Sequence, residues 1–457
     1  MVNGVQQLGL GESTLTQPKI KSKNIDVLAE YRRTKHKNAA NFVVIGHVDS
    51  GKSTLMGRLL FDLGAIDQRT IDKYKRDAEA MGKGSFAFAW VLDSGTEERE
   101  RGVTMDIAAN KFDTQKTSFT ILDAPGHQDF VPNMIAGAAQ ADFAVLVIDS
   151  SPNGFESGLR GQTKEHAILA KSIGLQRLIV AVNKMDTIQW SKDRFEEIKT
   201  QMSALLKSIR FNLEAITFVP CSGLLGENIL MPPLSDSKAP WYKGDTLVQA
   251  LDAFEPVTHN IERPLRMTVD NVYKSGAQAA ITISGRIEAG SLQIGESILI
   301  QPSAETASIR AVDIEADGSE KIHEWAVAGQ NVTLHLTDID VTNSTPVRPG
   351  DIISNSTHNP LTTSKSFTMH ILTFAHVFPQ YIEIHRGRLN VPGRISRLVG
   401  VLNKRTGEVI KKKPQMVKPE EAARVVIEVE DKGIPIESGN RVVLRAGGET
   451  IAAGLVE

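Results

Sequence analysis

The stretch that decides the fold is FVVIGHVDSGKSTLMGRLL, residues 42–60. Its first four residues are apolar and predict a buried strand, and the segment from Thr54 to Leu60 predicts the start of a helix. Between them, GHVDSGKS matches the spacing GxxxxGK[ST] of a phosphate-binding loop. In such a loop the backbone N–H groups and the helix N-terminus cradle phosphate oxygens, Lys52 reaches the outer phosphates, and Ser53 offers its hydroxyl to Mg²⁺. A glycine-rich turn without a ligand is the alternative, but the flanking strand and helix favour the phosphate loop.

A second motif, NKMD at residues 183–186, predicts which base the nucleotide carries. The Asp186 carboxylate accepts hydrogen bonds only, so it can take both the N1–H and the N2–H of guanine. Adenine has no such donor pair and would leave the carboxylate buried and unpaired. We expect Asn183 to brace the loop near the base and the stem of Lys184 to cover one face of the ring. An isolated NKxD sequence is weak evidence for guanine binding. Its position after a phosphate loop makes the evidence strong and predicts GTP and GDP as ligands.

A third motif, DAPGH at residues 123–127, follows a second apolar run at 119–122 that predicts a strand. Asp123 is suited to the surroundings of the metal ion, and Gly126 lets its backbone approach the γ-phosphate. His127 follows this motif directly, where a group that orients the attacking water is required. We therefore predict that His127 is catalytic. No arginine is evident as a finger within the chain, so hydrolysis is expected to be slow without an activator.

The charged segment EERERGVT, residues 97–104, ends in a hydroxyl side chain at Thr104. By itself such a segment is typical of a solvated loop. Between a phosphate loop and the DAPG motif it instead predicts a switch, whose Thr104 reaches Mg²⁺ only when the γ-phosphate is present. The predicted metal-binding residues are Ser53, Thr104 and Asp123.

These motifs together with CSG at residues 221–223 resemble the translational GTPases of the elongation factor one-alpha superfamily. The resemblance continues from about residue 40 to the end of the chain. Further segments resemble the Hbs-type ribosome-rescue GTPases, the partners of Pelota: GKGSFAFAW at 82–90, DFVPNMI at 129–135, WYKG at 241–244, SGRIEAG at 284–290, KKKP at 411–414 and TIAAG at 450–454.

The resemblance implies a set of site residues in this sequence. Val48 and Val103 match an apolar pair that gates His127 from the attacking water, although two packed core valines remain the alternative. The residues that match GTP-binding positions are His47, Val48, Asp49, Ser50, Gly51, Lys52, Ser53, Thr54, Asp123, Gly126, Asn183, Lys184, Asp186, Cys221, Ser222 and Gly223.

The resemblance also implies a function and partners. A rescue GTPase delivers a Pelota-type, tRNA-shaped protein to stalled ribosomes, contacts ribosomal RNA and proteins, and is a monomer or a heterodimer with its partner. Two alternatives stay open: an elongation factor that delivers aminoacyl-tRNA, and a GTP-binding adaptor that does not hydrolyse GTP. Members of this family usually carry a longer N-terminal region, so the sequence is expected to be a truncated or a shortened member.

Composition sets broad limits. With 457 residues the chain is too long for one ordinary core, and two to four domains are expected. Its net charge of −2 does not favour general binding to polyelectrolytes. The single cysteine, Cys221, excludes an intrachain disulfide framework and suits a reducing cytosol, where we expect it to be a small packed residue. No apolar run is long enough to span a bilayer, so the expected location is cytoplasmic, away from membranes.

Periodicity divides the chain into a lead and three domains. Residues 1–40 are polar and predict a flexible lead that ends in a short helix, near 25–31, against the GTPase domain. Residues 41–257 alternate apolar runs with amphipathic segments, which predicts a doubly wound α/β P-loop domain with a mostly parallel sheet. After it, short strands predict two antiparallel β-barrel domains, residues 263–355 and 364–457. Turns are expected at Gly285, Gly290 and Gly295.

Two charged features are open to more than one interpretation. A basic cluster in the third domain predicts either a contact with RNA phosphates or an acidic partner, or a lysine-rich edge strand that stays solvated. Arg58, near the phosphates, is expected to pair with Glu97 or Glu98. The cluster consists of Arg394, Arg397, Lys404, Arg405, Lys411, Lys412 and Lys413.

Overall fold

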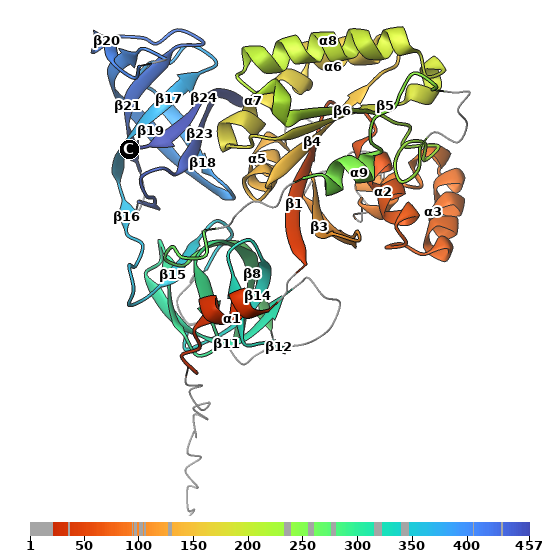
Figure 1. Cartoon of the computed structure of the whole chain (residues 1–457). Helices are drawn as coiled ribbons and strands as arrows, with labels where there is room; N and C mark the ends of the chain where they lie inside the picture. Colours follow the sequence, from red (N-terminus) through yellow and green to blue (C-terminus); the bar gives the residue numbers. More distant parts are fainter. Residues whose placement is uncertain are drawn as a thin grey trace, which may run out of the picture.

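A computed structural model shows an α/β domain and two barrels around a common junction (Figure 1). We call them domain 1, domain 2 and domain 3 in chain order. The fold class predicted from the sequence is confirmed. The structure describes residues 22–34, 37–93, 95, 98–99, 104, 107–126, 130–232, 239–254, 260–275, 280–314, 322–339, 347–404, 406–430 and 433–457.

Domain 1 is built on one sheet with the strand order β2-β3-β1-β4-β5-β6. All neighbours in it are parallel except β2, which pairs antiparallel with β3 at the edge. The inner strands β4 and β5 are the continuous apolar runs seen in the sequence, and both are almost wholly buried. The strands are β1 Asn38–Ile45, β2 Ala108–Asp113, β3 Thr117–Asp123, β4 Phe143–Asp149, β5 Leu178–Asn183 and β6 Ile216–Pro220.

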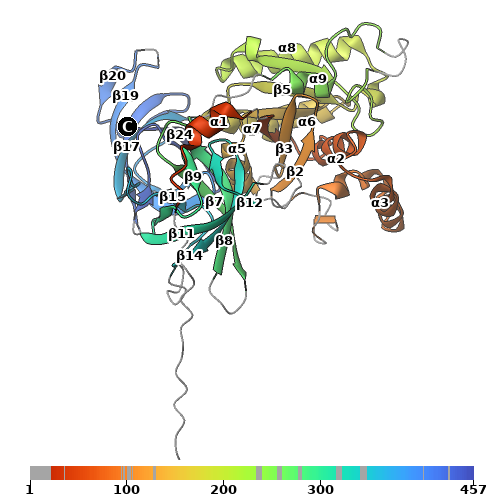
Figure 2. The same ribbon diagram turned by 60° about the horizontal axis from the view of Figure 1, so that its bottom comes forward.

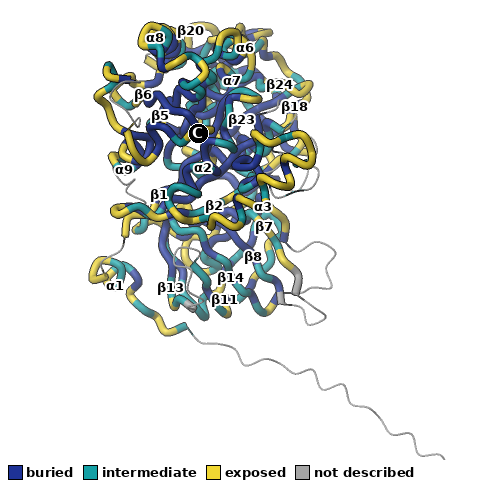
Figure 3. The backbone as a smooth tube through the Cα atoms, turned by 90° about the vertical axis from the view of Figure 1, so that its right-hand side faces the viewer, coloured by how far each residue is buried: buried dark blue, intermediate teal, exposed yellow. Residues whose placement is uncertain are grey.

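Helices cover both faces of this sheet because alternate residues of each strand point to opposite sides. In β1, Val43 and Ile45 pack into a core with α5, α7 and α8, whereas Phe42 and Val44 pack into a second core with α2 and α9. The buried strands between the two layers are visible in Figure 3. The helices are α2 Lys52–Asp62, α3 Gln68–Ala80, α5 Val131–Ala139, α6 Gly154–Arg160, α7 Gln162–Ile173, α8 Lys192–Ser208 and α9 Leu247–Asp252; short 3₁₀ turns span Gly84–Phe86, Ala89–Val91, Met185–Ile188 and Leu213–Ala215.

Domain 2 is an antiparallel barrel in which β10 closes the ring by pairing with β11. One sequence expectation is wrong here, because Gly285 lies inside β8 and not in a turn. A Cβ at this position would lie 2.0 Å from the Thr268 carbonyl oxygen, so the glycine allows β7 and β8 to approach closely. The strands are β7 Arg266–Ser275, β8 Ala280–Ala289, β9 Ser291–Gln293, β10 Ser297–Gln301, β11 Glu305–Ile314, β12 Ile322–His323, β13 Trp325–Val327, β14 Asn331–Thr337 and β15 Ile352–Asn355.

Domain 3 is a second barrel, closed by the pairing of β18 with β19. Within the described part of the chain, β20 pairs with β19 alone and all of its residues are exposed, so it is an edge strand. Of the basic cluster, Arg394 is paired with Glu428 and Arg405 lies outside the described residues. The strands are β16 Thr363–Ser364, β17 Ser366–Thr373, β18 Tyr381–Arg386, β19 Leu389–Leu402, β20 Val409–Lys412, β21 Ala422–Val429, β22 Ile434–Pro435, β23 Arg441–Ala446 and β24 Glu449–Val456.

The predicted N-terminal helix exists as α1, Val27–Arg33, but its packing partner was predicted wrongly. It lies on domain 2, beside β9 and β13, and not on domain 1 (Figures 1 and 2). The Tyr31 ring meets Trp325 edge to face at 6.4 Å, and the backbone N–H of Ile25 donates to Gln293 at 2.9 Å. Domain 2 offers these apolar and amide partners, so the helix buries its one apolar face there.

The three domains meet at the C-terminal end of α5. Gln140, the residue after this helix, donates to Asp270 of domain 2 at 2.7 Å. Arg286 of β8 donates to both oxygens of Asp142 in domain 1, at 2.8 and 2.9 Å. On the other side, α7 packs against β23 and β24 of domain 3. No helix among the described residues has the length and apolar character needed to cross a membrane.

Candidate functional site: a nucleotide pocket

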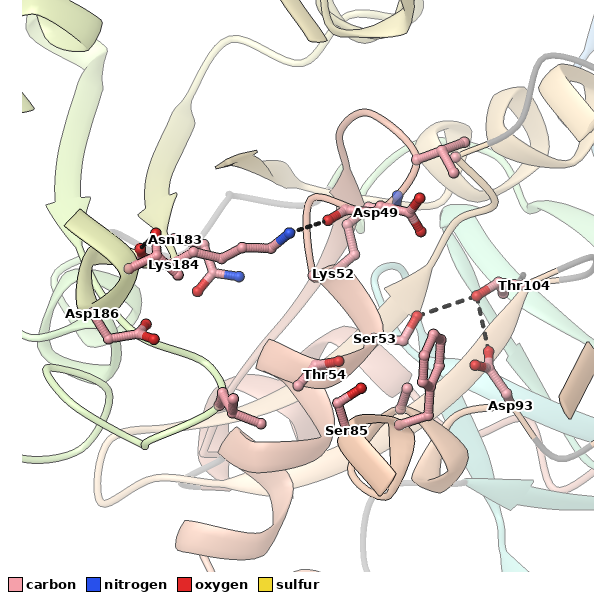
Figure 4. A pocket seen from close by; sticks show the side chains of 17 residues that line it. Asp49, Lys52, Ser53, Thr54, Ser85, Asp93, Thr104, Asn183, Lys184 and Asp186 are labelled. Atoms are coloured by element: carbon pink, nitrogen blue, oxygen red, sulfur yellow. Dashed lines mark hydrogen bonds between the residues drawn. The ribbon is translucent and has the colours of Figure 1, made fainter. Parts of the chain in front are cut away.

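A cavity of about 380 Å³ lies at the carboxyl ends of the parallel strands of domain 1 (Figure 4). It brings together three of the sequence motifs: the phosphate loop, the NKMD motif and the DAPG motif, with Thr104 at its edge. The carboxyl edge of an open parallel sheet is the usual place for a ligand in such folds. The predicted residues that line it are Val48, Asp49, Gly51, Lys52, Ser53, Thr54, Thr104, Gly126, Asn183, Lys184 and Asp186.

The phosphate loop leads from β1 into α2, and two of its glycines are required by the geometry. Gly46 has a φ of 148° and a Cβ there would lie 2.4 Å from the Val147 carbonyl oxygen, and Gly51 has a φ of 86°. α2 begins at Lys52, so its free N–H groups face the cavity. The buried Lys52 ammonium donates to the carbonyls of Gly46 and His47, at 3.1 and 2.9 Å. Burial lowers the pKa of Lys52, while the nearby Asp123 opposes that shift.

The NKMD side of the cavity is tied to the phosphate loop by hydrogen bonds. Asn183 donates to the Ser50 carbonyl at 3.0 Å and accepts from the Gly223 N–H at 2.9 Å. The Lys184 ammonium donates to the Asp49 carbonyl at 2.6 Å and to Asp149 at 2.7 Å, so this side chain spans the two motifs (Figure 4). Asp186 lines the pocket from the same side, where it can meet a base.

Several predicted GTP-binding residues support the pocket from behind. The thiol of Cys221 is fully buried, and burial raises its pKa, which fits a packed residue better than a nucleophile. Ser222 is also buried and accepts a hydrogen bond from the Leu225 N–H at 3.3 Å. The side chains of His47 and Ser50 do not line the pocket; that of His47 borders a separate hollow with Arg160.

Hydroxyl and carboxylate groups gather at the other end of the pocket. Ser53 donates to Asp123 at 2.8 Å. The Ser53 hydroxyl lies 3.2 Å from that of Thr104, which donates to Asp93 at 2.9 Å (Figure 4). Burial raises the pKa of Asp123 to about 7, and repulsion from Asp93 adds to this; burial also raises the pKa of Asp93 to about 6. One oxygen of Asp123 is buried and accepts no hydrogen bond from the residues that the structure describes. The carboxylate and hydroxyl oxygens gathered here are hard donors of the kind that Mg²⁺ binds, in small number, beside phosphate and water.

Asp93 was not identified from the sequence. It follows an apolar run, residues 90–92, that forms part of a short 3₁₀ turn packed on α2. A carboxylate directly after a buried apolar run was the only signal. Ser85, Phe86 and Ala89 of the same segment also line the pocket, and they belong to the stretch 82–90 that carried the family resemblance.

Of the three residues predicted to act in catalysis, the structure describes only Val48. His127 and Val103 lie outside the described residues. Val48 is half-buried and lines the pocket, so it is not a packed core valine. Among the described residues Arg58 pairs with Asp62 one helical turn away, at 2.8 Å, and not with Glu98 as expected. Glu97 lies outside the described residues as well.

Comparisons with known proteins agree with this geometry. The family model of the elongation factor Tu GTP binding domain matches residues 37–257, and that of the GTP-eEF1A C-terminal domain-like family matches residues 366–457. The "Elongation factor 1 alpha-like protein" of Schizosaccharomyces pombe is 40% identical, over 100% of this chain and 77% of its own length. The chain belongs to the elongation factor 1-alpha family of translational GTPases. It is therefore a GTPase that uses GTP and Mg²⁺.

Two further similarities bear on the branch of the family and on the fold. "Protein HBS1" of Drosophila melanogaster is 40% identical over 95% of this chain, which spans 65% of that protein's length. The Ski7 GTPase-like domain of S. cerevisiae, solved with GDP and inorganic phosphate, superposes with a TM-score of 0.79 over 95% of this chain and 100% of its own. Because the two sequences are only 21% identical, this similarity is evidence for the three-domain fold alone. The predicted relationship to Hbs-type GTPases is confirmed.

Proposed function

We propose that this chain delivers a Pelota-type, tRNA-shaped protein to stalled ribosomes and hydrolyses GTP there, in ribosome rescue and in no-go and non-stop mRNA surveillance. The observation that carries the proposal is the 40% identity to "Protein HBS1", which extends over 95% of the chain and so includes both barrels. The barrels are the parts that would hold the partner. The proposed location is the cytoplasm, where ribosomes translate.

We assign the nucleotide contacts as follows. Asp186 reads the guanine edge, while Asn183 and the loop at Cys221, Ser222 and Gly223 hold that side of the pocket together. Lys52 and the N-terminus of α2 bind the phosphates, assisted by the loop residues 47–54 and by Gly126. A Cβ at Gly126 would lie 2.4 Å from the Lys52 nitrogen, so glycine is needed where the two segments meet.

Ser53, Thr104 and Asp123 would hold Mg²⁺, which offsets phosphate charge when bound. The Thr104 hydroxyl contacts both Ser53 and Asp93, which supports its assignment as the switch residue that reaches Mg²⁺. We assign His127 as the group that orients the attacking water, with Val48 and Val103 as an apolar gate. The pocket position of Val48 supports this gate.

The position of α5 supports a link from the γ-phosphate to the barrels. This helix begins five residues after Gly126 and ends at Ala139, beside Gln140 and its bond to Asp270 of domain 2. The helix also packs on β18 of domain 3. A shift of the DAPG segment on phosphate release would therefore move a helix that touches both barrels, and the partner would be released.

The test is binding of the full chain to a purified Pelota-type protein and to aminoacyl-tRNA, each with a GTP analogue and with GDP. Binding to the Pelota-type protein that is favoured by GTP supports the proposal. Equal affinity with the GTP analogue and with GDP would contradict the proposed coupling between the nucleotide and partner binding. The nucleotide can control partner binding only if the partner binds the two states with different affinities.

A second candidate is an elongation factor that delivers aminoacyl-tRNA. The similarity to the S. pombe elongation factor 1 alpha-like protein, at the same 40% identity, keeps it open. GTP-favoured binding to aminoacyl-tRNA, and none to the Pelota-type protein, would establish this candidate instead.

A further inference from the structure

The outer side of the phosphate loop rests on α7, and two α7 side chains accept hydrogen bonds from it. The Gly46 N–H donates to Nδ1 of His166, and the Val48 N–H donates to Oε1 of Gln162, each at 3.3 Å. Gln162 and His166 are four residues apart and so lie on the same face of the helix, one turn from each other. One helix face therefore holds two N–H groups of the loop.

His166 is a polar side chain that is completely buried. It is 0% exposed, and its Nε2 is buried without a partner among the described residues. Burial and the nearby Lys52 lower its pKa to about 3, so the ring is neutral at physiological pH. Because Nδ1 accepts from Gly46, the proton is on Nε2. The ring is thus in the tautomer that the bond to the loop requires.

These bonds act on the peptide groups that hold Lys52. The Lys52 ammonium donates to the carbonyls of Gly46 and His47, while α7 accepts from the N–H groups of Gly46 and Val48. The three residues 46–48 are therefore held from both sides. The later part of the loop is held by Asn183 and Lys184, which donate to the carbonyls of Ser50 and Asp49.

α7, which carries Gln162 and His166, is itself held in place by packing on two domains. Leu169 and Ala170 on this helix are fully buried in the core of domain 1. Near its C-terminal end, Arg441 of domain 3 donates to the Ser172 carbonyl at 3.3 Å, and the helix also packs on β23 and β24. Because α7 is packed against both the core of domain 1 and domain 3, it can keep the phosphate loop in a fixed position.

We propose that Gln162 and His166 are positioning residues of this GTPase, which hold residues 46–48 in the conformation that presents Lys52 to the phosphates. Neither side chain lines the nucleotide pocket. They act through the loop, and their loss speeds the release of nucleotide. The inference concerns the GTPase activity and is independent of the identity of the delivered partner.

The test is the rate at which the full chain releases a fluorescent GDP analogue, measured by stopped flow with an excess of GDP. His166→Leu removes the acceptor and should raise the release rate about tenfold, as expected for one neutral hydrogen bond. His166→Asn places an amide oxygen near the position of Nδ1 and should restore a rate close to that of the wild type. Leu169→Ala is the matched control, because it disturbs packing of the same helix without touching the loop.

Gln162→Met gives an independent measurement, since Gln162 is only half-buried and its replacement should leave the melting temperature nearly unchanged. It should also raise the release rate about tenfold. In steady state, both loss variants should raise KM for GTP more than they change kcat. Wild-type release rates in Gln162→Met would overturn the proposal. So would equal acceleration in His166→Leu, His166→Asn and Leu169→Ala, because packing alone would then explain the effect.

Discussion

Replacing Arg286 by methionine should loosen the contact between domain 2 and domain 1. The guanidinium of Arg286 donates to both carboxylate oxygens of Asp142, at 2.8 and 2.9 Å, and it also donates to the Gln140 carbonyl. The two paired side chains are only 9% and 6% exposed. Methionine keeps the apolar stem but leaves Asp142 charged, buried and short of one partner.

The size of the effect follows from this burial. Removing one member of a buried ion pair typically costs about 3–5 kcal/mol, because the remaining charge has lost both water and its partner. Asp142 still accepts from the Asn41 N–H at 2.8 Å, so the lower end of this range is expected. The interface can open and admit water, which relieves the charge at the expense of domain contact. The variant Arg286→Met with Asp142→Asn should therefore be less destabilised than Arg286→Met alone.

Calorimetry of the full chain with GDP can measure this effect. In Arg286→Met, we expect the unfolding of domain 2 to separate from that of domain 1 and to move to lower temperature. The matched control is Arg394→Met, which breaks a pair with Glu428 whose side chains are 55% and 38% exposed. An exposed pair should contribute little. If Arg286→Met and Arg394→Met unfold alike, or if adding Asp142→Asn brings no recovery, the reasoning from burial is wrong.

Three further predictions test the site and the barrel. Asp186→Asn should shift nucleotide preference from GTP toward xanthosine triphosphate, and competition binding that still favours GTP would contradict the guanine contact. His127→Ala should keep GTP affinity and lose ribosome-stimulated turnover in a single-turnover assay; unchanged stimulated turnover would exclude the assigned role. Burial raises the pKa of Asp351 in domain 2 to about 6, so its ionised form costs stability above that pH. Asp351→Asn should thus stabilise domain 2 by at most about 3 kcal/mol at pH 8, and the gain should vanish as pH falls from about 6 to below 4, as urea unfolding at several pH values would show.

The fold was largely predictable because its signals are local. β1, the phosphate loop and α2 lie within 25 consecutive residues, and the glycines and the N-terminus of the helix have the same roles in any chain with this spacing. β4 and β5 are apolar at every position except their last residues, Asp149 and Asn183, because helices cover both faces of the sheet. The change to short strands after domain 1 likewise indicated two barrels.

The errors share one cause, which is that a local pattern does not specify its partner. The apolar face of α1 was visible in the sequence, but its packing on domain 2 depends on where the barrel lies. Arg58 has an acidic partner one helical turn away in Asp62, closer in the chain than the switch residue Glu98 that was expected to pair with it. Gly285 is predicted in a turn because glycine is common there, but a glycine within a strand can equally allow two strands to approach closely.

The sequence by itself determined the nucleotide, because the groups that recognise phosphate and guanine lie in short motifs with their own backbone geometry. Only the tertiary structure decided what surrounds those motifs. Asp93 is 30 residues from Asp123, and His166 is 120 residues from Gly46, yet each acts within the same pocket or on the same loop. Their chemistry arises from burial and proximity, which depend on strand order and helix packing and have no signature in the local sequence.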